Sequence, residues 1–448
     1  MQWASVKWFT RLRQKIIKEA NMSDIVKIAG GVTAAKGFSA ACTEAGIKYK
    51  NRVDMAMVYS KKPCTAAGTF TLNVVKAAPV LFDKNVIEKS DHVNAVVINA
   101  GIANACTGAE GYKICESTAA AASEALSIDK EAVLVASTGV IGFQIPEEKI
   151  VNGTKVLATK LSSDLEAGTA ASKAIMTTDT KNKEIAFSFE VEGKKIVVGG
   201  MCKGSGMIHP NMGTMLAFVT TDAAVEKKLL QKTLKEIVGD TFNMVSVDGD
   251  TSTNDTLVVL ANGESGAAKI EDENSEAYKL FAEALRKVCE YLAIFIAADG
   301  EGATKLFTAN VINVSDKAKA KLLAKTVIQS SLSKAAVFGG DANWGRFLCA
   351  LGYSGAEFNP DKTDIWITEG NIENSKLGMT DLSKYMESGL KLVEGGRATD
   401  YSEEIAAKIL QCEEVIVTCD MKEGNESAVA HGCDLSYDYV KINADYRS

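Results

Sequence analysis

The spacing of hydrophobic and polar positions predicts a chain of mixed strands and helices from about residue 50 to the end. Short unbroken apolar runs are typical of buried strands, and apolar residues recurring every three or four positions are typical of helices. Strands are expected at 94–99, 132–136, 215–219 and 256–260, helices at 112–126, 155–176, 226–238 and 275–293, a hairpin over 184–198, and further elements near 316–334, 364–369, 403–411 and 413–419.

The order of these elements favours an α+β fold. Strands and helices are mixed without a regular strand-helix-strand period, which favours sheets sandwiched by helices over a barrel. Neither Gly30-Gly31 nor Gly199-Gly200 fits a G-x-G-x-x-G pattern, and the sequence has no P-loop. A nucleotide-binding fold of the doubly wound type is therefore disfavoured.

The first 22 residues form a basic extension with two interpretations. Aromatic and aliphatic residues mix there with Lys and Arg, and no acidic residue precedes Glu19. Such a segment is typical of an amphipathic helix in a transit peptide or at a membrane surface. The favoured interpretation is an upstream extension before a second start at Met22, because serine is scarce and no cleavage signature follows. The sequence thus predicts a cytoplasmic protein, with the mitochondrial matrix as the alternative.

Composition narrows the function further. The formal charge of −7 gives no electrostatic footprint for nucleic acid or an anionic membrane. No apolar run approaches the ~18 residues that a membrane span needs. The ten cysteines form no C-x-x-C pair and indicate reduced thiols. With only three histidines and no Cys/His cluster at ligand spacing, we expect no metal site of the zinc type.

The most informative chemistry lies between Lys203 and Thr220, where a glycine-rich segment leads into a threonine that opens an apolar strand. Glycine permits backbone geometry closed to other residues, so the Thr214 hydroxyl could attack the Gly213 carbonyl. An N-to-O acyl shift and hydrolysis would then free an N-terminal threonine. Its hydroxyl is a nucleophile, and its own α-amine, with a reference pKa of about 7.7–8.0, is the general base.

This segment resembles the signature of the ornithine acetyltransferase family, the bifunctional glutamate N-acetyltransferases, whose members cleave themselves before the motif threonine. The family usually has alanine where this chain has Gly213. The resemblance extends over about residues 24–448, through the blocks STGVIG at 137–142, TTDT at 177–180, KGSGMIHPNMGTMLAF at 203–218, SVDGDTSTNDT at 246–256, DGEGATK at 299–305, NWGR at 343–346 and GCDLSYDYVKINADYRS at 432–448.

The resemblance implies an αββα sandwich of the self-cleaving, N-terminal-nucleophile type. It implies an α-chain of residues 23–213 after the extension 1–22, a β-chain of residues 214–448, and an α2β2 assembly. The implied reaction moves acetyl from N2-acetyl-L-ornithine to L-glutamate through acetyl-Thr214, without a cofactor. Use of acetyl-CoA as a second donor is left open.

The resemblance also implies roles for individual residues. Thr138 and Gly139 match the oxyanion-hole pair, and a strand-end turn with a hydroxyl and a backbone N–H suits an oxyanion. Lys203 and Glu301 match substrate contacts, a complementary pair for the carboxylate and ammonium of ornithine.

Further contacts are implied at both ends of the site. Thr177 or Thr178 matches one substrate contact, and the resemblance leaves open which. Asn443 and the terminal Ser448 match contacts from the C-terminus.

The segment 246–256 is interpreted as a structural or site-lining loop, because its aspartates lack the spacing of a calcium loop. No role follows for the turn-forming segment 339–346.

Two alternatives remain at the level of sequence. The first is an aminopeptidase or amidase of the same self-cleaving type, with water as the acceptor. The second is an uncleaved binding or scaffold protein for arginine-pathway intermediates.

Overall fold

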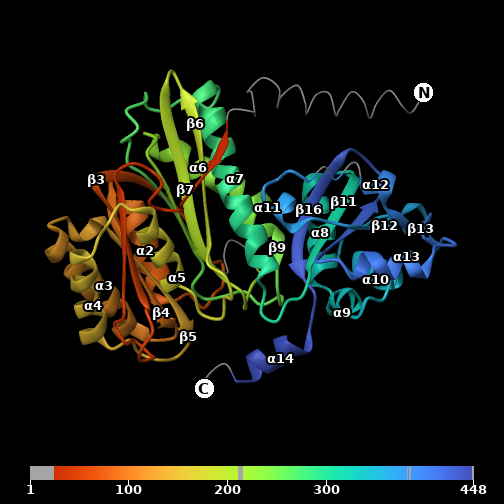
Figure 1. Cartoon of the computed structure of the whole chain (residues 1–448), viewed down its shortest axis with the longest axis horizontal. Coiled ribbons are helices and arrows are strands. Elements are labelled where there is room, and N and C mark those ends of the chain that lie inside the picture. Colours follow the sequence, from red (N-terminus) through yellow and green to blue (C-terminus); the bar gives the residue numbers. More distant parts are fainter. Residues whose placement is uncertain (1–24, 210–214, 381, 383–384, 446–448) are drawn as a thin grey trace.

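The structure is a computed structural model that describes residues 25–209, 215–380, 382 and 385–445. The extension 1–22, the predicted cleavage site Gly213-Thr214 and Ser448 lie outside the described residues. The described chain forms two regions side by side, each built on its own sheet, with the long helix α7 (Glu276–Ala298) between them (Figure 1).

The first region is built on a nine-stranded sheet. Its order is β1-β6-β7-β8-β10-β3-β4-β5, and β2 pairs with β3. The 16-residue β3 joins two halves, because its first part pairs with β2 and β4 and its last part with β10. The strands are β1 (Val26–Ile28), β2 (Phe38–Thr43), β3 (Met55–Phe70), β4 (Val93–Ile102), β5 (Val133–Val140), β6 (Lys183–Val191), β7 (Lys194–Lys203), β8 (Leu216–Thr221) and β10 (Thr256–Ala261).

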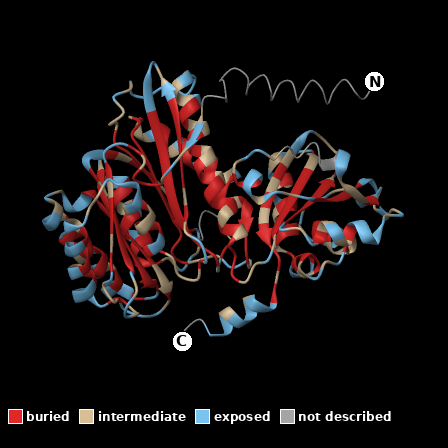
Figure 2. Ribbon diagram, in the orientation of Figure 1, coloured by how far each residue is buried: buried red, intermediate tan, exposed pale blue. Residues whose placement is uncertain are grey.

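Helices cover both outer faces of this region. Successive side chains of a strand point to opposite faces: in β8, Leu216 and Phe218 pack into the core shared with β3–β5, whereas Ala217 and Val219 pack toward α6 and α7. The two faces give an αββα arrangement with buried strands inside (Figure 2). The remaining helices are α2 (Ala78–Lys89), α3 (Gly108–Leu126), α4 (Glu147–Thr159), α5 (Leu165–Ala174) and α6 (Lys227–Asp240).

The second region is built on a seven-stranded sheet of order β14-β13-β12-β15-β11-β16-β9. Its strands are β9 (Val245–Ser246), β11 (Leu306–Val314), β12 (Asp364–Glu369), β13 (Leu390–Glu394), β14 (Arg397–Ala398), β15 (Glu414–Asp420) and β16 (Glu426–Cys433). Its helices are α8 (Lys317–Gln329), α9 (Ser331–Gly339), α10 (Trp344–Gly352), α11 (Ile372–Lys376), α12 (Tyr385–Ser388), α13 (Glu403–Leu410) and α14 (Tyr437–Ala444). Helix α14 lies below the boundary between the two regions (Figure 1).

The structure confirms the predicted α+β class and most predicted elements, but the single helix over 155–176 is wrong. The chain there forms the end of α4 and then α5, separated by residues 160–164. Ser162 exchanges backbone hydrogen bonds with Ala40, at 2.8 and 3.0 Å, in an isolated bridge that a continuous helix could not form. This tertiary contact overrides the helical spacing of the local sequence.

The predicted cleavage point falls between two neighbouring strands of one sheet. β7 precedes residue 213 and pairs antiparallel with β8, which follows it, with Lys203 opposite Leu216. β8 then pairs in parallel with β10. Segments from both sides of residue 213 therefore share one sheet and one core. None of the helices in the described part of the chain is long and apolar enough to cross a membrane.

Candidate active site

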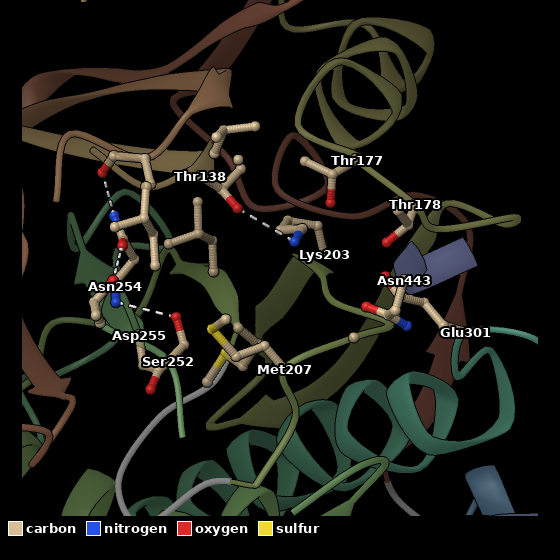
Figure 3. A pocket seen from close by; sticks show the side chains of 18 of the residues that line it. Thr138, Thr177, Thr178, Lys203, Met207, Ser252, Asn254, Asp255, Glu301 and Asn443 are labelled. Atoms are coloured by element: carbon tan, nitrogen blue, oxygen red, sulfur yellow. Dashed lines mark hydrogen bonds between the residues drawn. The ribbon is translucent and has the colours of Figure 1, made fainter. Parts of the chain in front are cut away.

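A cavity of about 490 Å³ lies where the ends of β5 and β7 meet the start of β8 (Figure 3). It also receives residues from the loop before β10, from the turn after α7 and from α14. Every predicted site residue that the structure describes lines it. The lining comprises Ala103, Thr138–Phe143, Thr177, Thr178, Lys203, Gly206, Met207, Met215, Leu216, Ser252–Asp255, Glu301 and Asn443.

Thr138 and Gly139 lie within the last residues of β5, not in the predicted turn. They pair in parallel with Ala100 and Gly101 of β4, so the sheet itself holds their backbone. Gly139 has φ +127°, and a Cβ there would lie 2.3 Å from the carbonyl carbon of Gly101. Only glycine fits this crossing, so a side chain at position 139 would push β4 and β5 apart and displace the Thr138 hydroxyl from the cavity wall.

Lys203, at the end of β7, brings a buried cation to this wall. Its side-chain Nζ donates a hydrogen bond to the Thr138 hydroxyl at 3.3 Å (Figure 3). Burial lowers the pKa of Lys203, and the nearby carboxylates, Asp179 foremost, offset this only in part. A desolvated ammonium beside the cavity is suited to bind an anionic group.

A buried network of ion pairs lies next to Lys203. Lys183, with a fully buried side chain, bridges Asp179 at 2.8 Å and Asp299 at 2.5 Å. Asp179 also accepts the backbone N–H of Gly204 at 2.7 Å. Burial would raise the pKa of Asp179, but Lys183 and Lys203 together lower it to about 2. Sequence reasoning missed this network, because nothing in the spacing of the three residues shows that they meet.

Glu301 supplies the negative charge of the cavity. Its carboxylate is 5% exposed and accepts a hydrogen bond from the Asn443 amide at 2.8 Å. The backbone of Gly206 passes so close that a Cβ there would lie 2.2 Å from this carboxylate. The predicted contacts Glu301 and Asn443 are therefore neighbours, although 142 residues separate them in the sequence.

Thr177 and Thr178 both line the cavity, so the choice between them stays open. The Thr178 hydroxyl shares a hydrogen bond of 2.8 Å with the Ser205 hydroxyl. The Thr177 backbone N–H donates to Asp179 at 3.1 Å, and its carbonyl accepts from Arg52. The TTDT segment thus connects the cavity to the ion network.

The predicted site-lining loop 246–256 does reach the cavity, through residues 252–255. The Asn254 amide donates to the Ser137 carbonyl at 2.8 Å and so ties the loop to β5. Asp248 accepts the backbone N–H groups of Met207 at 2.6 Å and Ile208 at 2.9 Å. This second contact fixes the segment that leads to the predicted cleavage site. Within the described residues no cluster of His, Cys, Asp or Glu could hold a metal ion.

The layered fold and the composition of this cavity fit the acyltransferase class that the sequence predicts. The end of β5 brings the Thr138 hydroxyl to the cavity, and buried charges of both signs, Lys203 and Glu301, lie in the same lining. Such a lining suits a small ligand that carries both charges.

Comparison with known proteins agrees with this assignment. The ArgJ family model matches residues 39–448. The arginine biosynthesis bifunctional protein ArgJ 1 of Clostridium acetobutylicum is 48% identical over 95% of this chain and all of its own length. The ArgJ protein of Caldanaerobacter subterraneus is 47% identical over 94% of this chain and 99% of its own. The chain therefore belongs to the ArgJ family, which confirms the predicted kinship and the predicted place in arginine biosynthesis.

Solved structures of the same family are similar to parts of the chain. The ArgJ protein of Bacillus halodurans is 40% identical over 43% of this chain and 98% of the solved chain, with a TM-score of 0.41. An ornithine acetyltransferase of Mycobacterium tuberculosis, solved in complex with ornithine, is 38% identical over 43% of this chain and all of the solved one, with a TM-score of 0.39.

Proposed function

We propose that this enzyme transfers the acetyl group of N2-acetyl-L-ornithine to L-glutamate through an acetyl ester on Thr214. The observation that carries the proposal is the convergence of Thr138, Gly139, Lys203 and Glu301 on one cavity from three separate parts of the chain. The cavity opens beside Met215, the residue that follows Thr214 in the sequence.

The first half-reaction begins when cleavage at Gly213-Thr214 has freed the threonine amine. The Thr214 hydroxyl attacks the acetyl carbonyl, and its proton passes to the α-amine. The Gly139 N–H and the Thr138 O–H stabilise the oxyanion. The C–N bond then breaks, the departing α-nitrogen takes up the proton, and ornithine leaves.

The second half-reaction retraces the steps of the first in reverse order, with the α-amine of glutamate in place of that of ornithine. The neutral α-amine of glutamate attacks the acetyl ester through the same oxyanion, and Thr214 regains its proton as N-acetylglutamate leaves. Lys203 is suited to the substrate carboxylate, while Glu301, held by Asn443, is suited to the δ-ammonium of ornithine. Ser448 and either Thr177 or Thr178 complete the proposed contacts.

The assembly proposed for the enzyme is an α2β2 tetramer of its own two fragments, in the cytoplasm, without a metal or cofactor. Because β7 and β8 come from opposite sides of the cleavage point and share a sheet, the fragments would stay associated after cleavage. The name "bifunctional" of the relatives supports a second assay, in which acetyl-CoA replaces N-acetylornithine as the donor.

Product analysis with labelled N-acetylornithine tests the proposal. We expect one N-acetylglutamate for each ornithine released, and little release of free acetate. An enzyme that frees acetate at the same rate with or without glutamate would instead be an amidase. Binding of N-acetylornithine without turnover would indicate the scaffold alternative.

A further inference from the structure

Asp255 is a buried carboxyl in the cavity wall to which the proposed reaction gives no task. Its side chain is 1% exposed, and neither carboxyl oxygen has a hydrogen-bond partner at bonding distance and angle among the described residues. The nearby Thr71 hydroxyl donates instead to the carbonyl of Ser252, at 2.8 Å. Buried polar groups normally have hydrogen-bond partners. A carboxyl in a cavity wall without one therefore indicates a hydrogen-bond donor that a ligand brings into the cavity or that the reaction generates there.

Strand register relates Asp255 to Met215, the first described residue after the predicted cleavage point. β10 pairs in parallel with β8, Thr256 opposite Leu216, and the Thr256 N–H donates to the Met215 carbonyl at 3.0 Å. Asp255 therefore lies level with Met215, across a strand spacing of about 4.8 Å. Cleavage after residue 213 would leave a new amine on the residue bonded directly to Met215.

The charges around Asp255 favour one more cation. Burial raises the pKa of Asp255 well above its ordinary range. The Thr71 and Ser252 hydroxyls, the Lys203 ammonium and the Met215 backbone N–H lie near the carboxyl and offset this only in part, although none of them meets it at bonding distance and angle. The Lys203 charge is itself opposed by Asp179 and Glu301. Buried carboxylates are stable when they are paired with a cation that donates hydrogen bonds. A primary ammonium group supplies both.

We propose that Asp255 is the acceptor for a primary ammonium group at the point of acetyl transfer. The inference rests on the proposed function, which supplies two such groups. One is the α-ammonium that forms at the new chain end when the threonine hydroxyl gives up its proton. The other is the α-ammonium of the incoming glutamate, which binds before it passes a proton to the free threonine α-amine and attacks as the neutral amine. In both cases Asp255 is a positioning residue. It stabilises the chain-end ammonium while the C–O bond forms, or it orients the glutamate nitrogen for formation of the C–N bond at the acetyl carbon.

The test compares Asp255→Asn with Asp83→Asn. Asp83 is a matched control, because it is also fully buried with one unpartnered carboxyl oxygen, but it lies in α2 and does not line the cavity. The two half-reactions are measured separately across pH. Acetylation is the first-turnover release of ornithine without glutamate, and deacetylation is transfer to glutamate at varied concentration.

The two sources of the ammonium predict different results. If Asp255 holds the freed α-amine, Asp255→Asn slows acetylation about tenfold and leaves the KM for glutamate unchanged. The pH at which the acetylation rate falls on the acid side of its pH–rate profile also moves down by about one unit. This direction follows because an adjacent carboxylate raises an ammonium pKa by 1–3 units. If Asp255 holds glutamate, acetylation is unchanged and the KM for glutamate rises about tenfold. Asp83→Asn leaves both half-reactions unchanged.

Two outcomes would overturn the inference. If Asp255→Asn cleaves and performs both half-reactions like the wild type across pH, the inference is overturned while the proposed function stands. If Asp255→Asn folds, by circular dichroism and melting, yet stays uncleaved while Asp83→Asn cleaves, the carboxyl acts before the amine exists and the inference is overturned.

Discussion

The two regions of the molecule each bury a group of polar side chains, and the two groups differ in how they are satisfied. In the second region, the Glu414 carboxylate accepts hydrogen bonds from Ser375, at 2.8 and 2.9 Å, and from Thr308, at 3.0 Å. The Thr308 hydroxyl also contacts His431 Nδ1 at 3.0 Å. None of these side chains lines the cavity that Thr138 and Lys203 share.

In the first region, polar groups of the same kinds face open space. Asp255 has no hydrogen-bond partner among the described residues, Lys203 is desolvated, and the Thr138 hydroxyl retains a proton to donate while accepting from Lys203. Burial of polar groups therefore does not by itself indicate a site. Unused hydrogen-bonding capacity beside a cavity does, because it costs stability unless a ligand or an intermediate uses it.

The largest expected effect comes from Glu301→Gln. Breaking one side of a buried charge pair costs about 3–5 kcal/mol, against under ~1 kcal/mol for an exposed pair. We expect the loss in kcat/KM for N-acetylornithine to exceed the loss for N-acetylnorvaline, which lacks the δ-ammonium, by the equivalent of about 3–5 kcal/mol in activation free energy. Glu404→Gln, at an exposed ion pair with Lys408, is the matched control. Equal losses on the two donors would show that Glu301 does not recognise the ammonium.

A pair of threonine substitutions separates the two polar groups directly. Losing one oxyanion donor typically lowers kcat about 10²–10³-fold, so we expect this of Thr138→Ala, with a smaller change in KM. Thr308→Ala should leave kcat unchanged and cost about 1–3 kcal/mol of unfolding free energy, because Glu414 loses a donor. Steady-state kinetics and denaturant melts of both variants give the comparison. A change confined to KM in Thr138→Ala would reassign that residue to substrate binding.

The second region should lose stability first as pH falls. Burial lowers the pKa of His431 from 6.5 to about 4. Between pH 6.5 and pH 4 the histidine is therefore protonated in the unfolded chain but neutral in the folded chain. Stability is therefore full above about pH 6.5 and declines by about 2–3 kcal/mol toward pH 4. His209 has a similarly lowered pKa of about 4 and contributes in the same window. Wild type and His431→Gln are compared by denaturant melts, and identical pH slopes would contradict the assignment.

The ion network of the first region should fail at lower pH. The folded pKa of Asp179 is lowered to about 2, so its contribution is present above its unfolded value near 4 and is lost between about pH 4 and pH 2. The shift corresponds to about 2 kcal/mol. Asp179→Asn should show a smaller loss of unfolding free energy over this interval. The same slope in wild type and variant would mean that Lys183 does not stabilise this carboxylate.

The sequence predicted the strands of the sheet around the cavity well, because β4, β5, β8 and β10 contain short runs of apolar residues that can be recognised without any tertiary contact. It placed a single helix over 155–176, because the bridge between Ser162 and Ala40 is a tertiary contact without a local signal.

The same division holds for the site. Thr138, Lys203, Glu301 and Asn443 were predicted through family-like motifs, and the structure brings them to one cavity. Asp255 was predicted only as part of a loop, because its lack of a hydrogen-bond partner depends on the packing of β8, β10 and β3 around it.

The most direct test of the central claim is a denaturing gel of the purified protein, with N-terminal sequencing of its fragments. The account predicts two fragments, of 213 residues and of 448 − 213 = 235 residues, the larger beginning Thr-Met-Leu-Ala-Phe. Thr214→Ala should remain a single inactive chain under the same conditions. A wild-type protein that stays intact and yet transfers acetyl at full rate would contradict the mechanism.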